Sequence, residues 1–134
     1  MTIMAGNYSI GWLYEGNVHN WYDFIVRKCH EYRCTEILSE TNADKGYLAR
    51  DLRKLGLKTR TYNENMNKAI KISTYLYESW HDLIWDEETD TEYMNQILDW
   101  RHDGTGHDDA PDSAASLCRF LKKQQSAIRT LWEM

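Results

Sequence analysis

Three aspartates lie within five positions of the segment GHDDAPDSAASL, residues 106–117. They are Asp108, Asp109 and Asp112, and Pro111 lies among them, directly before an apolar run. Carboxylate oxygens are the ligands that Mg²⁺ and Mn²⁺ prefer. Three like charges this close repel one another unless a positive group lies between them. The spacing therefore raises the question of whether this segment holds a metal ion.

An ordinary helix start is the alternative interpretation of the same segment. Proline is tolerated in the first turn of a helix, and nearby carboxylates are stabilised by the partial positive charge there. In a helical turn, Asp112 lies four positions after Asp108 and three after Asp109, so at most two of the three share one face. Helix capping accounts for one or two of the acids, and both interpretations stay open from this segment alone.

Glu40 adds weight to the metal interpretation. The segment TEILSE, residues 35–40, predicts a short buried strand that ends at this glutamate. Ligands of α/β proteins bind at the carboxyl ends of strands, although a strand end can also simply reach solvent. A strand-end glutamate together with aspartates at a helix start is the layout that two-metal phosphoryl chemistry requires.

Strands and helices are expected to alternate along the chain. Their expected ranges are a strand at 8–14, a helix from Asn17 or Asn20 to about Tyr32, a strand at 35–40, a helix capped by Asn42 or Asp44 and stopped near Gly56, a strand at 58–62, a helix at 64–79, a strand at 82–85, a helix capped by Thr89 or Asp90, and a last helix from near Pro111 to about Leu131. This order predicts an α/β fold with some parallel pairing, and 134 residues suit a single domain.

The charges are distributed unevenly around a formal net charge of −5. Residues 45–71 contain eight lysines and arginines against two acids, whereas residues 82–112 contain eleven acids against one arginine. The overall charge disfavours a nucleic-acid partner, but the asymmetry fits either two solvated faces or a basic DNA grip beside an acidic metal site.

Three cysteines, Cys29, Cys34 and Cys118, suit free thiols in a cytoplasm better than a disulfide framework. Cys29, His30 and Cys34 lack a fourth ligand at suitable spacing, so a zinc site is not expected. No apolar stretch approaches the roughly 20 residues of a membrane span, and we expect no membrane partner.

Three segments resemble, in the same order, the C-terminal nuclease domain of tailed-phage terminase large subunits, the DNA-packaging motors. They are EILSETNADKGYLARDL, NENMNKAIKI and GHDDAPDSAASL, and the similarity covers about residues 8–122. The HDDAPDS part is the most specific, and the strand-end glutamate followed by Asn and Gly is moderately specific. The resemblance implies a ribonuclease-H-like fold, a mixed sheet flanked by helices, and an endonuclease that cuts concatemeric double-stranded phage DNA with Mg²⁺ or Mn²⁺ in a two-metal site.

By this resemblance, Glu40 is the central-strand acid, and Asp108 with Asp109 supplies the late acid; these three are the expected catalytic and metal-binding residues. Asp112 matches the last aspartate of the motif and is expected at the edge of the metal site or as a helix cap.

The resemblance also assigns lysines to DNA. Lys68 and Lys71 match the basic positions of the family's K..KI helix, and together with Lys45 they are expected to contact DNA phosphates. The alternative is a solvated helix face.

The chain departs from the family in its first part. The family's first strand carries an aspartate, and it should lie just upstream of residues 8–14, where MTIMAGN contains no acid. Neither Glu15 nor Asp23 lies where that aspartate belongs, and no G-x-x-x-x-G-K-[ST] phosphate loop is present. We therefore expect a nuclease domain truncated before its first catalytic strand.

Two functions follow as alternatives. The chain is an endonuclease fragment completed by the terminase ATPase portion or an upstream fragment on a separate chain, or it is an inactive module that docks on the packaging motor or DNA. The portal and the small terminase subunit are further expected partners, in the cytoplasm of a bacterial host. A missing neighbour would leave the strand at 8–14 as an open sheet edge, which predicts pairing with another chain there.

Overall fold

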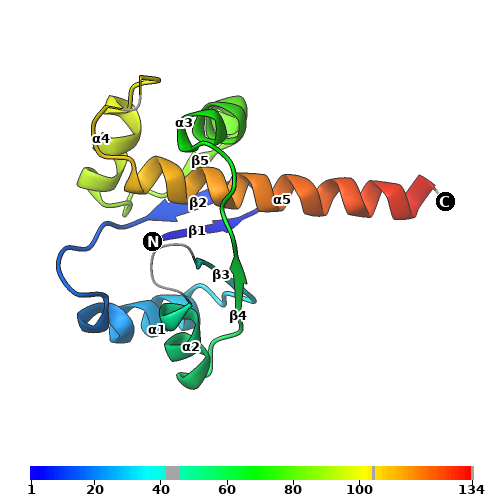
Figure 1. The fold of residues 1–134 in the computed structure, drawn as a ribbon. Coiled ribbons are helices and arrows are strands. Elements are labelled where there is room, and N and C mark those ends of the chain that lie inside the picture. The colour runs from blue at the N-terminus through cyan, green and yellow to red at the C-terminus, as the bar shows by residue number, and fades with distance from the viewer. Residues whose placement is uncertain (42–45, 104, 134) are drawn as a thin grey trace. The chain divides into compact units, whose positions relative to one another are not determined.

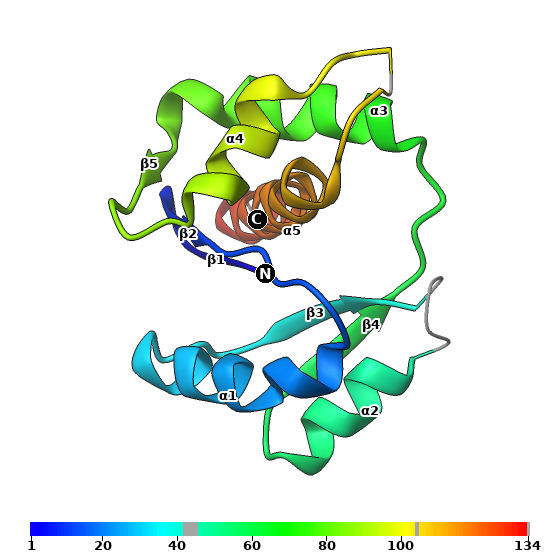
Figure 2. The same cartoon turned by 90° about the vertical axis from the view of Figure 1, so that its left-hand side faces the viewer.

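The computed structural model describes residues 1–41, 46–103 and 105–133. The chain forms two compact units: unit 1 contains Met1–Leu13 and Met66–Met134, and unit 2 contains Tyr14–Asn65. Each unit combines strands with helices, as Figures 1 and 2 show, so the expected mixed α/β class is confirmed.

Unit 1 contains a three-stranded sheet in the order β1-β2-β5. Strand β1 (Thr2–Ala5) pairs antiparallel with β2 (Tyr8–Gly11), and β2 pairs parallel with β5 (Ile84–Trp85). The turn between β1 and β2 contains Gly6 at a φ of 62°, a backbone conformation that glycine adopts without steric cost.

Strand β2 therefore has a hydrogen-bonded neighbour on each side. The expectation that residues 8–14 form an open edge is wrong, because residues 2–5 fold back as the hairpin strand β1 and pair with β2. The predicted pairing of this strand with another chain loses its basis.

The helices of unit 1 surround the N-terminal part of α5. They are α3 (Lys68–Lys71), its π-helical continuation η2 (Ile72–Tyr77), the 3₁₀ turn η3 (Trp80–Asp82), α4 (Thr91–Asp99) and α5 (Asp109–Glu133). Helix α5 runs between β1 and β2 on one side and α3, η2 and α4 on the other (Figures 1 and 2). The core of the unit is built from Ile72, Leu76, Tyr93, Ile97, Trp100, Ala110, Ala114, Ala115 and Cys118.

Tyr93 connects the sheet to α5 by packing and hydrogen bonds. Its side chain is fully buried against Gly11, where a Cβ atom would lie 2.3 Å from Tyr93 Cζ. Its hydroxyl lies 2.5 Å from Thr2 Oγ1, which is in turn 2.7 Å from Ser113 Oγ on α5. The close approach of ring and strand requires glycine at position 11.

Unit 2 is a two-stranded parallel sheet with helices. Its elements are the 3₁₀ turn η1 (Val18–Trp21), α1 (Tyr22–Glu31), β3 (Ile37–Glu40), α2 (Tyr47–Lys54) and β4 (Thr59–Tyr62). In this unit α1 and α2 lie on the same side of the β3–β4 pair (Figures 1 and 2). Glu40 is the last residue of β3, as predicted, and pairs with Tyr62.

Several predicted helix boundaries are confirmed. The Asn17 side chain accepts a hydrogen bond from the His19 N–H at the start of η1, and the Asp90 side chain accepts one from the Glu92 N–H at the start of α4. The other expected caps, Asn42 and Asp44, lie outside the described residues. Across the described part of the chain, no helix has the length and apolarity to cross a membrane.

Candidate metal and DNA-binding site

The start of α5 is where the three aspartates lie. The Asp112 N–H donates to the Asp108 carbonyl at 2.9 Å, which is the first hydrogen bond of the helix. The N–H of Ala110, in the same first turn, donates to the Gln96 side chain of α4 at 3.0 Å. Pro111 is buried in the first turn, where the missing N–H has no cost. The predicted helix start is confirmed.

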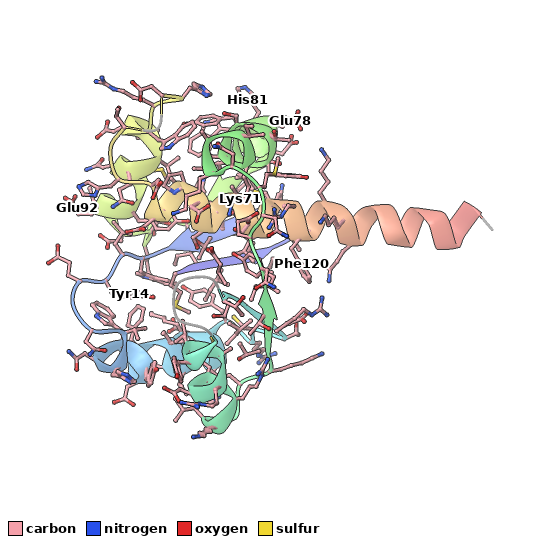
Figure 3. All side chains as sticks on the ribbon, in the orientation of Figure 1. Tyr14, Lys71, Glu78, His81, Glu92 and Phe120 are labelled. Carbon is pink, nitrogen blue, oxygen red and sulfur yellow. The ribbon has the colours of Figure 1, made fainter. Side chains whose placement is uncertain are left out.

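A buried lysine meets the last of the three acids. Lys71 Nζ lies 2.6 Å from Asp112 Oδ1 and donates a hydrogen bond to Ser116 Oγ at 2.9 Å. The Lys71 side chain is 0% exposed and that of Asp112 only 13%. Figure 3 labels Lys71, which reaches from α3 to α5. A buried ammonium needs such a partner, because an unpaired charge in the interior costs several kcal/mol.

A second lysine of α3 lies between two of the acids. Lys68 Nζ is 3.7 Å from Asp108 Oδ1 and 4.0 Å from Asp112 Oδ2, and its side chain is 51% exposed. Asp108 and Asp112 are therefore the two acids that share a face. The positive groups required between the clustered carboxylates are, in this structure, the ammonium groups of two lysines.

These contacts divide the three acids into two kinds. Asp112 fits poorly as a metal ligand because the Lys71 ammonium already holds one of its oxygens. Asp108 is 35% exposed and Asp109 is exposed, so their oxygens can approach a hard cation from solvent. Among the described residues, no three Asp, Glu, His or Cys side chains gather into a metal-binding group.

Glu40 belongs to unit 2, whereas the three aspartates belong to unit 1. Its side chain is half-buried at the end of β3. The next residue, Thr41, donates from its N–H to the Tyr62 carbonyl at 3.0 Å and from its hydroxyl to Asn63 Oδ1. The two parallel strands thus end at the same edge, and the side chains there are polar. Groups that bind ligands in α/β proteins usually lie at such strand ends.

The three lysines expected to contact DNA have different positions. Lys68 is exposed and can reach a phosphate. Lys71 is fully buried on Asp112 and Ser116, so a direct phosphate contact does not fit it, and its role is to neutralise Asp112. Lys45 lies outside the described residues.

Unit 2 presents further basic side chains, which we call the α2–β4 basic surface. They are Arg50, Arg53, Lys54, Lys58 and Arg60, all exposed. Positions 50, 53 and 54 are three and four apart and so share one face of α2. Arg53 Nε donates to the Thr59 carbonyl at 2.9 Å, which fixes part of this surface on β4.

Two residues that matter for the site were not singled out in the sequence. Ser116 accepts from Lys71, and Gln96 caps α5. Ser116 lies four positions after Asp112, so helical spacing alone places it on the same face. Gln96 has no such signal, because its contact depends on how α4 packs against α5.

No protein-family model matches this chain, and comparisons with curated proteins and with solved structures likewise gave no match. The terminase resemblance consequently rests on the three motifs alone.

Proposed function

We propose that this chain is the nuclease domain of a phage terminase large subunit and cuts concatemeric double-stranded DNA with Mg²⁺ or Mn²⁺. The observation that carries the proposal is the difference in exposure and ion pairing among the three aspartates at the start of α5. Two aspartates, Asp108 and Asp109, stay accessible to solvent, while lysines of α3 neutralise Asp112 and share Asp108.

The residues of the chain have distinct parts in this proposal. Asp108 and Asp109 offer oxygen ligands, and Glu40 is the third acid by resemblance to the family. These carboxylates would hold a divalent ion, which would supply Lewis-acid stabilisation of the charge that develops on the attacked phosphate. Lys68 and the α2–β4 basic surface hold phosphates of the duplex without reading its sequence.

The finer fold assignment, ribonuclease-H-like, belongs to the same proposal. The family's first-strand aspartate has no counterpart here, since β1 contains Thr2–Ala5 and no acid. Full activity would then need an acid from a partner chain that carries the terminase ATPase portion or an upstream fragment, whereas the acids of this chain alone should support nicking. The portal and the small terminase subunit are further proposed partners, and the cytoplasm of a bacterial host is the proposed location.

Nicking of supercoiled plasmid tests the proposal. The wild-type chain should convert plasmid to the open circle in Mn²⁺ or Mg²⁺, and Glu40→Gln, Asp108→Asn and Asp109→Asn should each remove the activity. Asp82→Asn and Glu87→Gln are matched controls, because these acids are exposed elsewhere in unit 1 and should leave cleavage unchanged. Undiminished cleavage by Glu40→Gln would overturn the assignment of that residue.

The alternative is an inactive module that binds DNA or the motor. The ammonium of Lys71 on Asp112 favours it, because this ion pair engages an aspartate that matches the last acid of the family's motif. This alternative predicts no nicking by any variant in either metal, together with salt-dependent DNA binding that survives Glu40→Gln and Asp108→Asn. A gel-shift series at increasing salt, run beside the nicking assay, separates the two functions.

A further inference from the structure

The C-terminal end of α1 brings two cysteines together. The Cys34 N–H donates to the Cys29 carbonyl at 2.9 Å, and the Arg33 N–H donates to the His30 carbonyl at 3.2 Å. Arg33 has a φ of 52°, in the left-handed region. This pair of hydrogen bonds around a left-handed residue is a Schellman motif.

Helix α2 ends in the same way and shows what the motif does to side chains. The Leu57 N–H donates to the Leu52 carbonyl at 3.1 Å, and Gly56, at a φ of 88°, donates to the Arg53 carbonyl at 3.0 Å. Leu52 and Leu57 are both buried. The two positions joined by the longer hydrogen bond commonly form an apolar contact in this motif.

In α1 the same two positions are occupied by thiols. Cys29 is buried at 4% exposure, Cys34 is half-buried, and both are free cysteines. A direct backbone hydrogen bond between two residues keeps their Cα atoms close, which a disulfide also requires. The fold therefore presents an adjacent pair of thiols, one reachable from solvent and one inside.

The two thiols differ in acidity. The Cys29 thiol donates a hydrogen bond to the Cys34 sulfur, which lowers the pKa of Cys34 to about 7 and raises the pKa of Cys29. Burial alone would raise the pKa of Cys34, but the hydrogen bond from Cys29 lowers it by more. A large fraction of Cys34 is consequently thiolate, the nucleophilic form, near neutral pH.

We propose that Cys29 and Cys34 form a thiol–disulfide exchange pair, in which Cys34 attacks low-molecular-weight disulfides of the glutathione type and Cys29 resolves the product. This function is independent of DNA cleavage.

The exchange balances in two steps. The Cys34 thiolate attacks one sulfur of the small disulfide, forms a mixed disulfide and releases one small thiolate. Cys29 then gives its proton to solvent and attacks the Cys34 sulfur, so that the S–S bond to the small molecule breaks and the second small thiolate leaves. The protein loses two thiol hydrogens as it closes the Cys29–Cys34 disulfide, and the small disulfide is reduced to two thiols.

Intact-mass spectrometry and peptide mapping after exposure of the full chain to oxidised glutathione test the proposal. The wild-type chain should gain an internal link between the peptides of Cys29 and Cys34, reversible by dithiothreitol. Cys29→Ser should instead accumulate one glutathione adduct on Cys34, because the resolving thiol is absent. Cys34→Ser should acquire neither. Circular dichroism checks that each serine variant is folded.

Cys118 is the matched control, since it is buried on α5 and burial raises its pKa to about 11. Its higher intrinsic nucleophilicity offsets only part of the difference in thiolate fraction. At pH 7, Cys34 should therefore react with iodoacetamide roughly a hundredfold faster than Cys118. Cys118→Ser should leave the internal link unchanged. Equal alkylation rates at the two cysteines, or no stable adduct in the Cys29→Ser chain, would overturn the proposal.

Discussion

The start of α5 in unit 1 and the end of β3 in unit 2 both present carboxylates, but the charges of the neighbouring side chains differ. Asp112 is held by a fully buried lysine. Glu40 is half-buried at a strand end, and the residues that follow the two paired strands, Thr41 and Asn63, are uncharged. An acid neutralised by a buried ammonium is part of what keeps a unit folded. Among the described residues Glu40 is not part of such an ion pair, so substitutions at the two places should have separable effects.

Lys71→Met should have the largest effect. It leaves the largely buried Asp112 carboxylate with only the half-exposed Lys68 ammonium at 4.0 Å, and breaking a buried ion pair in this way costs about 3–5 kcal/mol. Urea unfolding followed by tryptophan fluorescence measures the loss. Lys68→Met is the matched control and should cost less than about 1 kcal/mol, because its ion pairs are half-exposed.

Replacing both partners of the pair sharpens the test. Lys71→Met combined with Asp112→Leu should recover most of the lost stability, since well-packed apolar residues often substitute for a buried ion pair without net cost. If Lys71→Met alone costs no more than Lys68→Met, Asp112 does not have the structural role described here.

Gly11→Ala should have the second-largest effect on stability. The new Cβ would meet the ring of Tyr93 at 2.3 Å, and this contact cannot relax without disturbing the hydroxyl chain from Tyr93 through Thr2 to Ser113 on α5. Overpacking of this kind costs about 1–3 kcal/mol. Thermal unfolding measures it, and an unchanged melting temperature would show that β2 and α4 do not pack as described.

Glu40→Gln should change stability by less than about 0.5 kcal/mol, because it exchanges one half-exposed polar side chain for another of the same shape. Any loss of plasmid nicking in this variant then reports on chemistry. Should the substitution unfold unit 2, Glu40 would belong with Asp112 among the structural acids.

Single changes on the α2–β4 basic surface should have the smallest effects. Arg50→Gln removes an exposed charge, so it should weaken DNA binding modestly and reduce the slope of log affinity against log salt by about 1. Fluorescence anisotropy at several salt concentrations gives this slope. Glu87→Gln on the acidic segment of unit 1 should leave it unaltered.

Local signals in the sequence were enough to predict much of the fold. Asn17 and Asp90 cap helices as their types and positions indicate, Pro111 lies in a first turn, and Glu40 ends a strand. Strand β1 was missed, although a Gly-Asn pair after a short apolar segment is a hairpin signal.

The partner of Asp112 could not be predicted in the same way. Lys71 precedes Asp112 by 41 positions, and their contact depends on how α3 packs against α5. The helix also changes from α to π geometry directly after Lys71, which alters the 3.6-residue periodicity that would show which side chains face inward. Lys71 therefore looked like a surface lysine available to DNA.

Calorimetric titration with Mn²⁺ tests the central claim most directly, that Asp108 and Asp109 are the metal-binding acids of α5 and Asp112 is a structural one. The account predicts that the combined Lys71→Met and Asp112→Leu variant binds Mn²⁺ as the wild-type chain does, whereas Asp108→Asn and Asp109→Asn bind it far more weakly. Mn²⁺ binding that is lost in the combined variant, or retained in both asparagine variants, would contradict it.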